Sequence, residues 1–202
     1  MDGTVMAQIE TWFPTAIYVQ KNLFPRSMNN LWANKVISLK ENVPTGGKDW
    51  EGKTYTTHTT FDLKEDDIFK ELIAQVTDHV HEFTKAHGSE VKYSCQHAWA
   101  NVSLERNFQE YHTHDGSVFS AVYYPKVPEG SGNIVFEDPR LPDMLPIAKI
   151  SERNALSFEK IGYEPEEGML LIFRSYLRHA VKEGTNTEPR ISFALNFGPD
   201  GV

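Results

Sequence analysis

The chain has 202 residues, of which 40% are hydrophobic and 12% aromatic, and its net charge at neutral pH is −8. This composition supplies a core, so we expect 1–202 to form a single domain and not a disordered segment. The acidic balance argues against binding to nucleic acid, and no apolar run approaches the roughly 20 residues of a membrane span. The N-terminus shows no basic and apolar leader, which predicts a cytoplasmic protein.

The N-terminal part of the chain is expected to provide one strand and two helices. Residues 12–19 alternate small or polar with apolar side chains, which is typical of a strand at a sheet edge. After Ser27, apolar residues recur at helical spacing and stop before Pro44, so a helix is predicted there. A second helix is predicted after the acidic run 65–67, because an apolar stripe follows at helical spacing. Its members are Ile68, Leu72, Val76, Val80 and Phe83.

Short strands are predicted for most of the remaining chain. The helical spacing ends at Gly88, and apolar or aromatic runs then alternate with turn residues. Helices followed by many strands favour a mainly β fold, a sandwich or barrel core of 91–202 supported by helices from 1–90. The proline-containing stretch 138–167 is either a lid over a binding site or a plain surface connection. The predicted strands are 91–104, 117–124, 133–137, 169–173 and 190–197.

Cysteine and histidine usage narrows the kinds of site that the chain can carry. Cys95 is the only cysteine, which excludes a disulfide framework and a cysteine-rich zinc site, and we expect a buried free thiol. His112 and His114 precede one predicted strand, and His179 follows another. Side chains at i and i+2 of an extended segment face the same way, so His112 and His114 can reach one point. Structural roles are expected for the other histidines: His58, His79, His81, His87 and His97.

The last predicted strand carries a second chemical pattern. Arg190 and Ser192 lie on the same face of this strand. A guanidinium beside a hydroxyl can bind a carboxylate through a bidentate fork and one further hydrogen bond. A surface arginine on an edge strand is the alternative, and the pattern alone leaves both interpretations open.

These segments occur in an order that carries a resemblance. The quoted motifs are Trp99-Ala100-Asn101, His112-Thr113-His114, Val122-Tyr123-Tyr124, 131–140, 168–173, His179-Ala180-Val181 and Arg190-Ile191-Ser192. From about Trp12 onward the chain resembles the non-haem Fe(II)- and 2-oxoglutarate-dependent oxygenases. Within them it is similar to a small bacterial and phage group related to prolyl hydroxylases. The resemblance implies a double-stranded β-helix, a jelly-roll core with iron between its two sheets and 2-oxoglutarate beneath it.

The resemblance also implies the metal ligands. His112 and His179 match the two iron-binding histidines of the family. Its members usually have Asp or Glu two residues after the first histidine, whereas this chain has His114 there and an acid one residue later, Asp115. In an extended segment Asp115 points away from His112, so we predict a three-histidine site of His112, His114 and His179. A shifted register that pairs His114 with Asp115 stays open.

The cosubstrate residues follow from the same resemblance. Arg190 matches the basic residue that pairs with the distal carboxylate of 2-oxoglutarate, and Ser192 completes an Arg-x-Ser pair. Tyr123 matches a tyrosine that hydrogen-bonds this carboxylate, although strand parity leaves Tyr124 as the alternative. Asn101 either reaches the cosubstrate from a neighbouring strand or satisfies backbone groups.

The activity implied by the resemblance is a hydroxylation that consumes dioxygen and 2-oxoglutarate and releases succinate and carbon dioxide. The substrate class that it implies is an amino-acid residue of a peptide, such as proline, or a small molecule. The stretch 138–167 is the candidate substrate lid, with Arg140 at its base. Three histidines also suit a zinc hydrolase or hydratase with an open fourth position, and the pair Arg190 and Ser192 argues against it. A catalytically silent β-helix binding module is the third interpretation.

Overall fold

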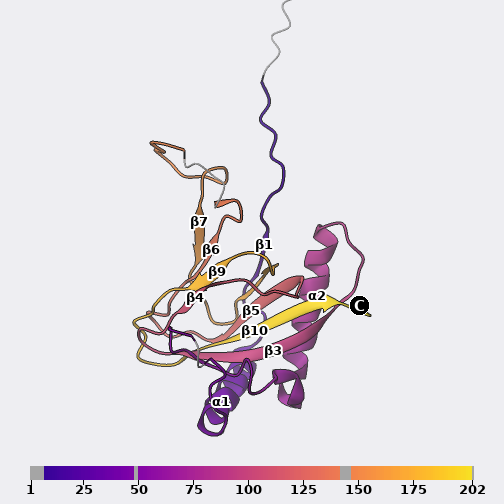
Figure 1. The fold of residues 1–202 in the computed structure, drawn as a ribbon. Coiled ribbons are helices and arrows are strands. Elements are labelled where there is room, and N and C mark those ends of the chain that lie inside the picture. Colours follow the sequence, from indigo (N-terminus) through magenta and orange to yellow (C-terminus); the bar gives the residue numbers. More distant parts are fainter. Residues whose placement is uncertain (1–6, 48–49, 142–146, 202) are drawn as a thin grey trace, which may run out of the picture.

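The computed structural model describes residues 7–47, 50–141 and 147–201, and its strands form two antiparallel sheets (Figure 1). The six-stranded sheet has the order β1-β8-β5-β10-β3-β2, and the four-stranded sheet has the order β4-β9-β6-β7. The strands of the larger sheet are β1 Ile17–Gln20, β2 Tyr55–Thr56, β3 Tyr93–Ser103, β5 Phe119–Lys126, β8 Leu170–Arg174 and β10 Arg190–Pro199. Those of the smaller sheet are β4 Gln109–His112, β6 Ile134–Glu137, β7 Lys160–Tyr163 and β9 His179–Val181. The predicted mainly β, double-stranded β-helix architecture is confirmed.

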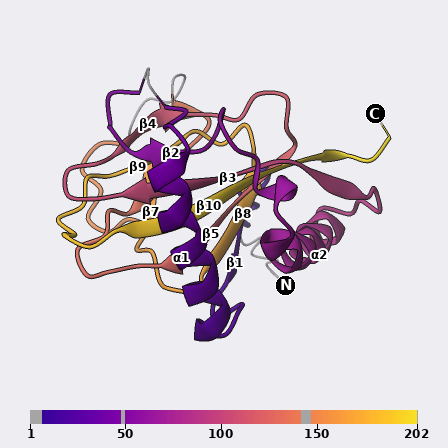
Figure 2. The same cartoon turned by 90° about the horizontal axis from the view of Figure 1, so that it is seen from below.

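Two α-helices in the described part of the chain, α1 (Arg26–Asn42) and α2 (Lys70–Ala86), lie against one side of the six-stranded sheet (Figure 2). Both helices were predicted from their apolar spacing. α2 follows two 3₁₀ turns, Leu63–Glu65 and Asp67–Phe69, whose starts are capped by aspartate side chains. Gly88 follows α2 with a φ of +74°, a backbone conformation that glycine adopts without strain and that ends the helix. Neither helix is long and apolar enough to cross a membrane.

The core has two parts, and each lies on one face of the six-stranded sheet. The larger part fills the space between this sheet and the helices, and it contains the fully buried side chains of Trp32, Leu72 and Phe193. The smaller part lies between the two sheets and contains Phe136 and Phe173. Because side chains alternate along a strand, the strands β5 and β8 contribute to both parts. The same strands therefore join the helix-covered core to the space between the sheets.

Some predictions differ from the observed elements. The first strand starts at Ile17, so 12–16 are not part of it. The strands β2, β4, β7 and β9 are two to four residues long and were not predicted, because so short a segment shows no periodicity. One of them, β7, lies within the stretch 138–167 and pairs with β6, while 142–146 lie outside the described residues. Cys95 is partly buried, where full burial was expected, and desolvation raises the pKa of its thiol to about 12.

Candidate functional site

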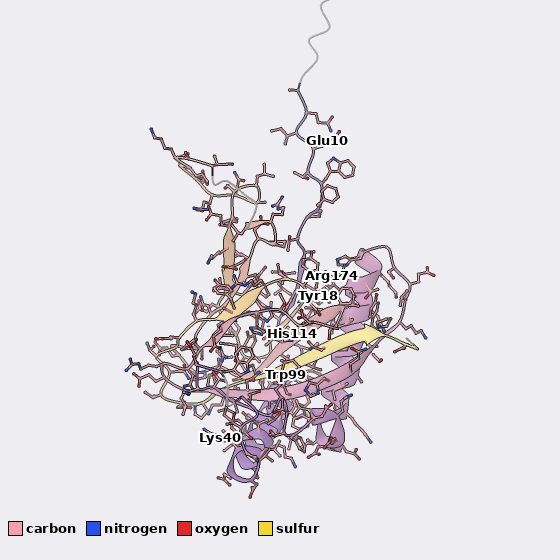
Figure 3. The ribbon with its side chains drawn as sticks, in the orientation of Figure 1. Glu10, Tyr18, Lys40, Trp99, His114 and Arg174 are labelled. Carbon is pink, nitrogen blue, oxygen red and sulfur yellow. The ribbon has the colours of Figure 1, made fainter. Side chains whose placement is uncertain are left out.

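A cavity of about 360 Å³ opens between the two sheets and collects most of the predicted site residues. The four-stranded sheet and its loops contribute His112, His114 and His179 to its lining. The six-stranded sheet contributes Arg190, Ser192, Asn101 and Tyr124. His114 and Trp99 lie between the sheets (Figure 3), and their ring centroids are 5.6 Å apart.

The three histidines converge on one point. His112 ends β4 and pairs in register with His179 at the start of β9, so both imidazoles leave the sheet on the same face. The loop after β4 brings in His114, whose backbone N–H donates to the carbonyl oxygen of Ser175 at 3.0 Å. One ring nitrogen from each histidine lies within 4.8 Å of the other two. Asp115 does not join this cluster, and its carboxylate accepts a hydrogen bond from the hydroxyl of Thr113 at 3.1 Å.

Hydrogen bonds and burial prepare these rings for a metal ion. Nδ1 of His112 donates to the carbonyl oxygen of Glu110 at 2.7 Å, and Nδ1 of His179 donates to that of Leu177 at 2.9 Å. Each of these two rings therefore keeps a lone pair on Nε2. Desolvation lowers the pKa of all three histidines, that of His114 to about 3, and the neighbouring imidazoles lower the pKa of His114 and His179 further. Neutral imidazole is the form that binds metal, so the cluster fits a divalent cation.

Arg190 provides a buried positive charge in the same cavity. It is 4% exposed and lies on β10, between β3 and β5, so it is not the surface arginine of an edge strand. Its Nη1 donates to the carbonyl oxygen of Gly132 at 2.9 Å, and its Nη2 donates to Oγ of Ser103 at 3.2 Å. Its Nε is buried and has no hydrogen-bond partner within the described part of the chain, where no carboxylate pairs with the guanidinium either. A buried cation of this kind favours an anionic ligand.

The other predicted cosubstrate residues divide between the two faces of the six-stranded sheet. Ser192 and Asn101 are register partners on β10 and β3, and both line the cavity. Tyr124 also lines it, with its ring centroid 5.9 Å from Cζ of Arg190, and burial raises the pKa of its hydroxyl to about 12. Tyr123 lies on the opposite face, where its hydroxyl donates to Oδ1 of Asn29 on α1. Consecutive residues of a strand face opposite ways, so the parity alternative, Tyr124, is the one beside Arg190.

Two further residues, Trp50 and His58, line the cavity although the sequence did not indicate them as site residues. The Trp50 ring lies 5.2 Å from that of His112, and the His58 ring lies 4.7 Å from that of Trp99. All four line the cavity. His58 was expected to be structural, and no spacing could connect it or Trp50 to His112, because both come from loops around the short strand β2.

The described residues of the stretch 138–167, which was proposed as a lid, do not lie at the cavity that contains the histidines. No described residue of 138–167 lines the cavity. Arg140 pairs with Asp138 and lines a second groove, of about 440 Å³, between the N-terminal segment and the hairpin of β6 and β7. The expected substrate contact of Arg140 is therefore not seen at the histidine cluster.

Comparisons with known proteins find a matching family and similar folds. A family model for 2OG-Fe(II) oxygenases matches residues 97–196, which include the three histidines and Arg190. A Pseudomonas putida prolyl-4-hydroxylase has a similar fold at 14% identity and a TM-score of 0.63, over 93% of this chain and 94% of that one. HygX from Streptomyces hygroscopicus, crystallised with nickel, 2-oxoglutarate and hygromycin B, has a TM-score of 0.66 at 12% identity, over 93% and 84% of the two chains. The collagen prolyl hydroxylase of Paramecium Bursaria Chlorella virus-1, in its 2OG complex, has a TM-score of 0.57 at 13% identity, over 90% and 94%. No curated protein sequence matches this chain.

Proposed function

Because this chain belongs to the Fe(II)- and 2-oxoglutarate-dependent oxygenases, we propose that it hydroxylates an amino-acid residue of a peptide, with a small molecule as the second substrate class. As a dioxygenase of this family it uses Fe(II), 2-oxoglutarate and dioxygen. The observation that carries the site assignment is the position of Arg190, whose buried guanidinium opens onto the cavity that holds the three histidines.

The residues present fit both the metal and the cosubstrate. His112, His114 and His179 would hold Fe(II) through neutral imidazole nitrogens. Arg190 would pair with the distal carboxylate of 2-oxoglutarate, and its unpartnered Nε supplies a free donor. When bound, Fe(II) and 2-oxoglutarate supply the oxidising chemistry that inserts oxygen into a C–H bond and releases succinate and carbon dioxide.

The protein's own contribution is to bind and to orient. The carbonyl oxygens of Glu110 and Leu177 fix the orientation of the His112 and His179 rings. The hydroxyls of Ser192 and Tyr124 would donate to the same carboxylate as Arg190, and the fact that all three side chains line one cavity supports this. Val122, Ile134 and Phe173 of the apolar cluster between the sheets also line the cavity, and an apolar lining strengthens a charged hydrogen bond.

The aromatic lining of the cavity supports a substrate with an apolar C–H surface. Trp50 lies beside His112, and Trp99 lies beside His114, so two indole rings flank the cluster of three histidines. Aromatic side chains offer a large rigid surface for a saturated ring such as that of a prolyl residue. Two of the similar structures are prolyl hydroxylases, which supports a peptidyl-proline substrate. HygX, which binds hygromycin B, supports the small-molecule alternative.

An anaerobic titration of the protein with Fe(II) and then 2-oxoglutarate tests the proposal. We expect the visible charge-transfer band of a chelated iron–oxoacid complex, weakened in Arg190→Ala. Aerobic incubation with proline-containing peptides should then release succinate and add one oxygen to a peptide. If no band forms and zinc stays bound through purification, the three histidines belong to a zinc hydrolase. Weak metal binding without turnover of 2-oxoglutarate would indicate a silent binding module.

A further inference from the structure

His114 differs from the other two histidines in what its Nδ1 meets. His112 and His179 each donate Nδ1–H to a backbone carbonyl oxygen. Nδ1 of His114 instead lies 3.2 Å from Nδ2 of the Asn196 side chain. An amide nitrogen donates and cannot accept, so Nδ1 of His114 accepts this hydrogen bond. The proton of the neutral His114 ring is therefore on Nε2.

The position of that proton matters because Nε2 of His114 faces the other ligands. It lies 3.3 Å from Nε2 of His179. His179 accepts there, because its own ring proton is on Nδ1 and is donated to Leu177. A ring nitrogen that carries a proton has no lone pair for a metal ion. With these hydrogen bonds, His114 has the tautomer that does not ligate through Nε2.

The partner of His114 is held by a pair of buried serines. Oγ of Ser120 donates to Oδ1 of Asn196 at 2.9 Å and lies 2.8 Å from Oγ of Ser175. Ser120 is 2% exposed, Ser175 is 1% exposed, and Ser120 is the register partner of Asn196 between β5 and β10. A hydroxyl both donates and accepts, so this chain of hydrogen bonds can run in either direction.

A half-turn of the Asn196 amide reverses the whole chain. It exchanges the positions of Oδ1 and Nδ2, which have nearly the same size and shape. Oδ1 then accepts from Nδ1–H of His114, while Nδ2 donates to Ser120 and Ser120 donates to Ser175. One proton leaves Nε2 of His114 and one is taken up at Nδ1 by exchange with water, so the ring stays neutral. In this arrangement all three histidines present a lone pair on Nε2.

We propose that Asn196 is the positioning residue of the third metal ligand, and that rotation of its amide selects the metal-binding tautomer of His114. The inference rests on the three-histidine centre of the proposed function. The Asn196 amide can hydrogen-bond either tautomer of His114, because the hydroxyls of Ser120 and Ser175 can reverse their hydrogen bonds when the amide turns. A carboxylate at this position would accept only, and would hold the proton on Nδ1 permanently.

Nitrogen NMR of the histidine side chains tests the tautomer directly, with zinc as a diamagnetic probe. In chelator-treated full-length protein labelled with ¹⁵N-histidine, we expect the His114 proton on Nε2, and on Nδ1 once Zn(II) is added. Asn196→Asp should show the proton on Nδ1 before and after the metal. A His114 ring in the unaltered protein that already carries its proton on Nδ1 before zinc would overturn the proposal.

Fe(II) affinity, measured anaerobically without 2-oxoglutarate, tests the energetic role. Loss of an outer hydrogen-bond partner of a metal-bound histidine costs about 10–100-fold in affinity, so we expect that loss in Asn196→Leu and recovery in Asn196→Asp. Asn29→Leu is the matched control, because it removes a buried asparagine from the helix side of the same sheet and should leave the affinity unchanged. Equal affinities of Asn196→Leu and the unaltered protein would overturn the proposal alone. Failure of the unaltered protein to bind Fe(II) and Zn(II) would overturn the proposed metal centre with it.

Discussion

The two sheets are buried to different extents, and they contribute different chemistry. The strands β5, β8 and β10 of the larger sheet are almost entirely buried, because helices cover one face and the smaller sheet lies against the other. In the smaller sheet, β4 is partly buried and β7 is mostly exposed. Arg190 and Ser192 lie on the larger sheet, whereas His112 and His179 lie on the smaller one. A buried cation requires fixed surroundings and exclusion of water, while metal ligands need a side that substrate can reach.

The smaller sheet compensates for its exposed outer face with charges. Tyr111 on β4 has Lys160, Arg178 and Lys182 within 5.7 Å of its ring centroid. Glu137 on β6 pairs with Lys160 and Arg178. These interactions connect β4, β6 and β7 across the face that none of the described helices covers, where an apolar cluster would be exposed to water. The proposed ligands His112 and His179 therefore lie on strands joined by polar as well as apolar contacts.

The largest effect is expected from removing a ligand of the smaller sheet. In His179→Ala the cluster keeps two imidazoles, which is one fewer than the facial arrangement requires, so iron binding and turnover should both be lost. Anaerobic Fe(II) titration and succinate release measure the two losses. His87→Ala, at the first residue after α2 and outside the cavity, is the control and should keep both. Iron binding that survives in His179→Ala would show that the metal lies elsewhere.

The next effect is expected from Arg190 on the larger sheet. Arg190→Met should weaken the binding of 2-oxoglutarate by about 2–5 kcal/mol, roughly 30-fold or more in Kd, because a buried charge pair loses one partner. It should leave Fe(II) affinity unchanged, and the stability without cosubstrate should not fall, since an unpaired buried charge is removed. Titration calorimetry with 2-oxoglutarate and thermal unfolding measure both quantities. A variant that loses stability and keeps its affinity for 2-oxoglutarate would make Arg190 a structural residue.

How far the sequence predicted the molecule depends on the length of each periodic segment. The helices and the strands β3, β5, β6, β8 and β10 follow apolar patterns and were predicted, with ends displaced by a few residues. The short strands of the smaller sheet are strands only because they pair with partners distant in sequence, such as β4 with β9. Their local sequence carries too few residues for such a pattern.

The site shows the same division. The alternation of side chains placed His112 and His114 together, and it placed Arg190 and Ser192 together. That these pairs share one cavity follows from sheet packing, which no spacing predicts, and it was implied only by the family resemblance. The sequence could not show which of Tyr123 and Tyr124 faces Arg190. Because β5 is buried on both sides, both tyrosines lie in an apolar run and no polar alternation distinguishes the two faces.

The pH dependence of stability sharpens the comparison of the two sheets. The three clustered histidines, His112, His114 and His179, have folded-state pKa values below the ordinary 6.5, down to about 3 for His114. Below pH 6.5 the unfolded chain binds protons that the folded, chelator-treated protein does not. As the pH is lowered, the free energy of unfolding should therefore fall by up to about 1.4 kcal/mol per pH unit for each histidine. Urea unfolding between about pH 7 and pH 5 measures the slope, in a range above the ordinary carboxylate pKa values. His114→Gln should flatten it, and an equal slope in this variant would contradict the neutral state of His114.

The smallest effects are expected from two neighbouring residues that face the two parts of the core. Tyr124→Phe removes a hydroxyl from the cavity wall near Arg190 and should raise the KM for 2-oxoglutarate about fivefold, the equivalent of a hydrogen bond worth about 1 kcal/mol. Tyr123→Phe should leave this KM unchanged and lower the free energy of unfolding by about 1–3 kcal/mol, because the buried Oδ1 of Asn29 loses its donor. Steady-state kinetics and urea unfolding of both variants separate the two faces of β5. The reverse pattern would return the cosubstrate contact to Tyr123, and it would require β5 to present its other face to the metal centre.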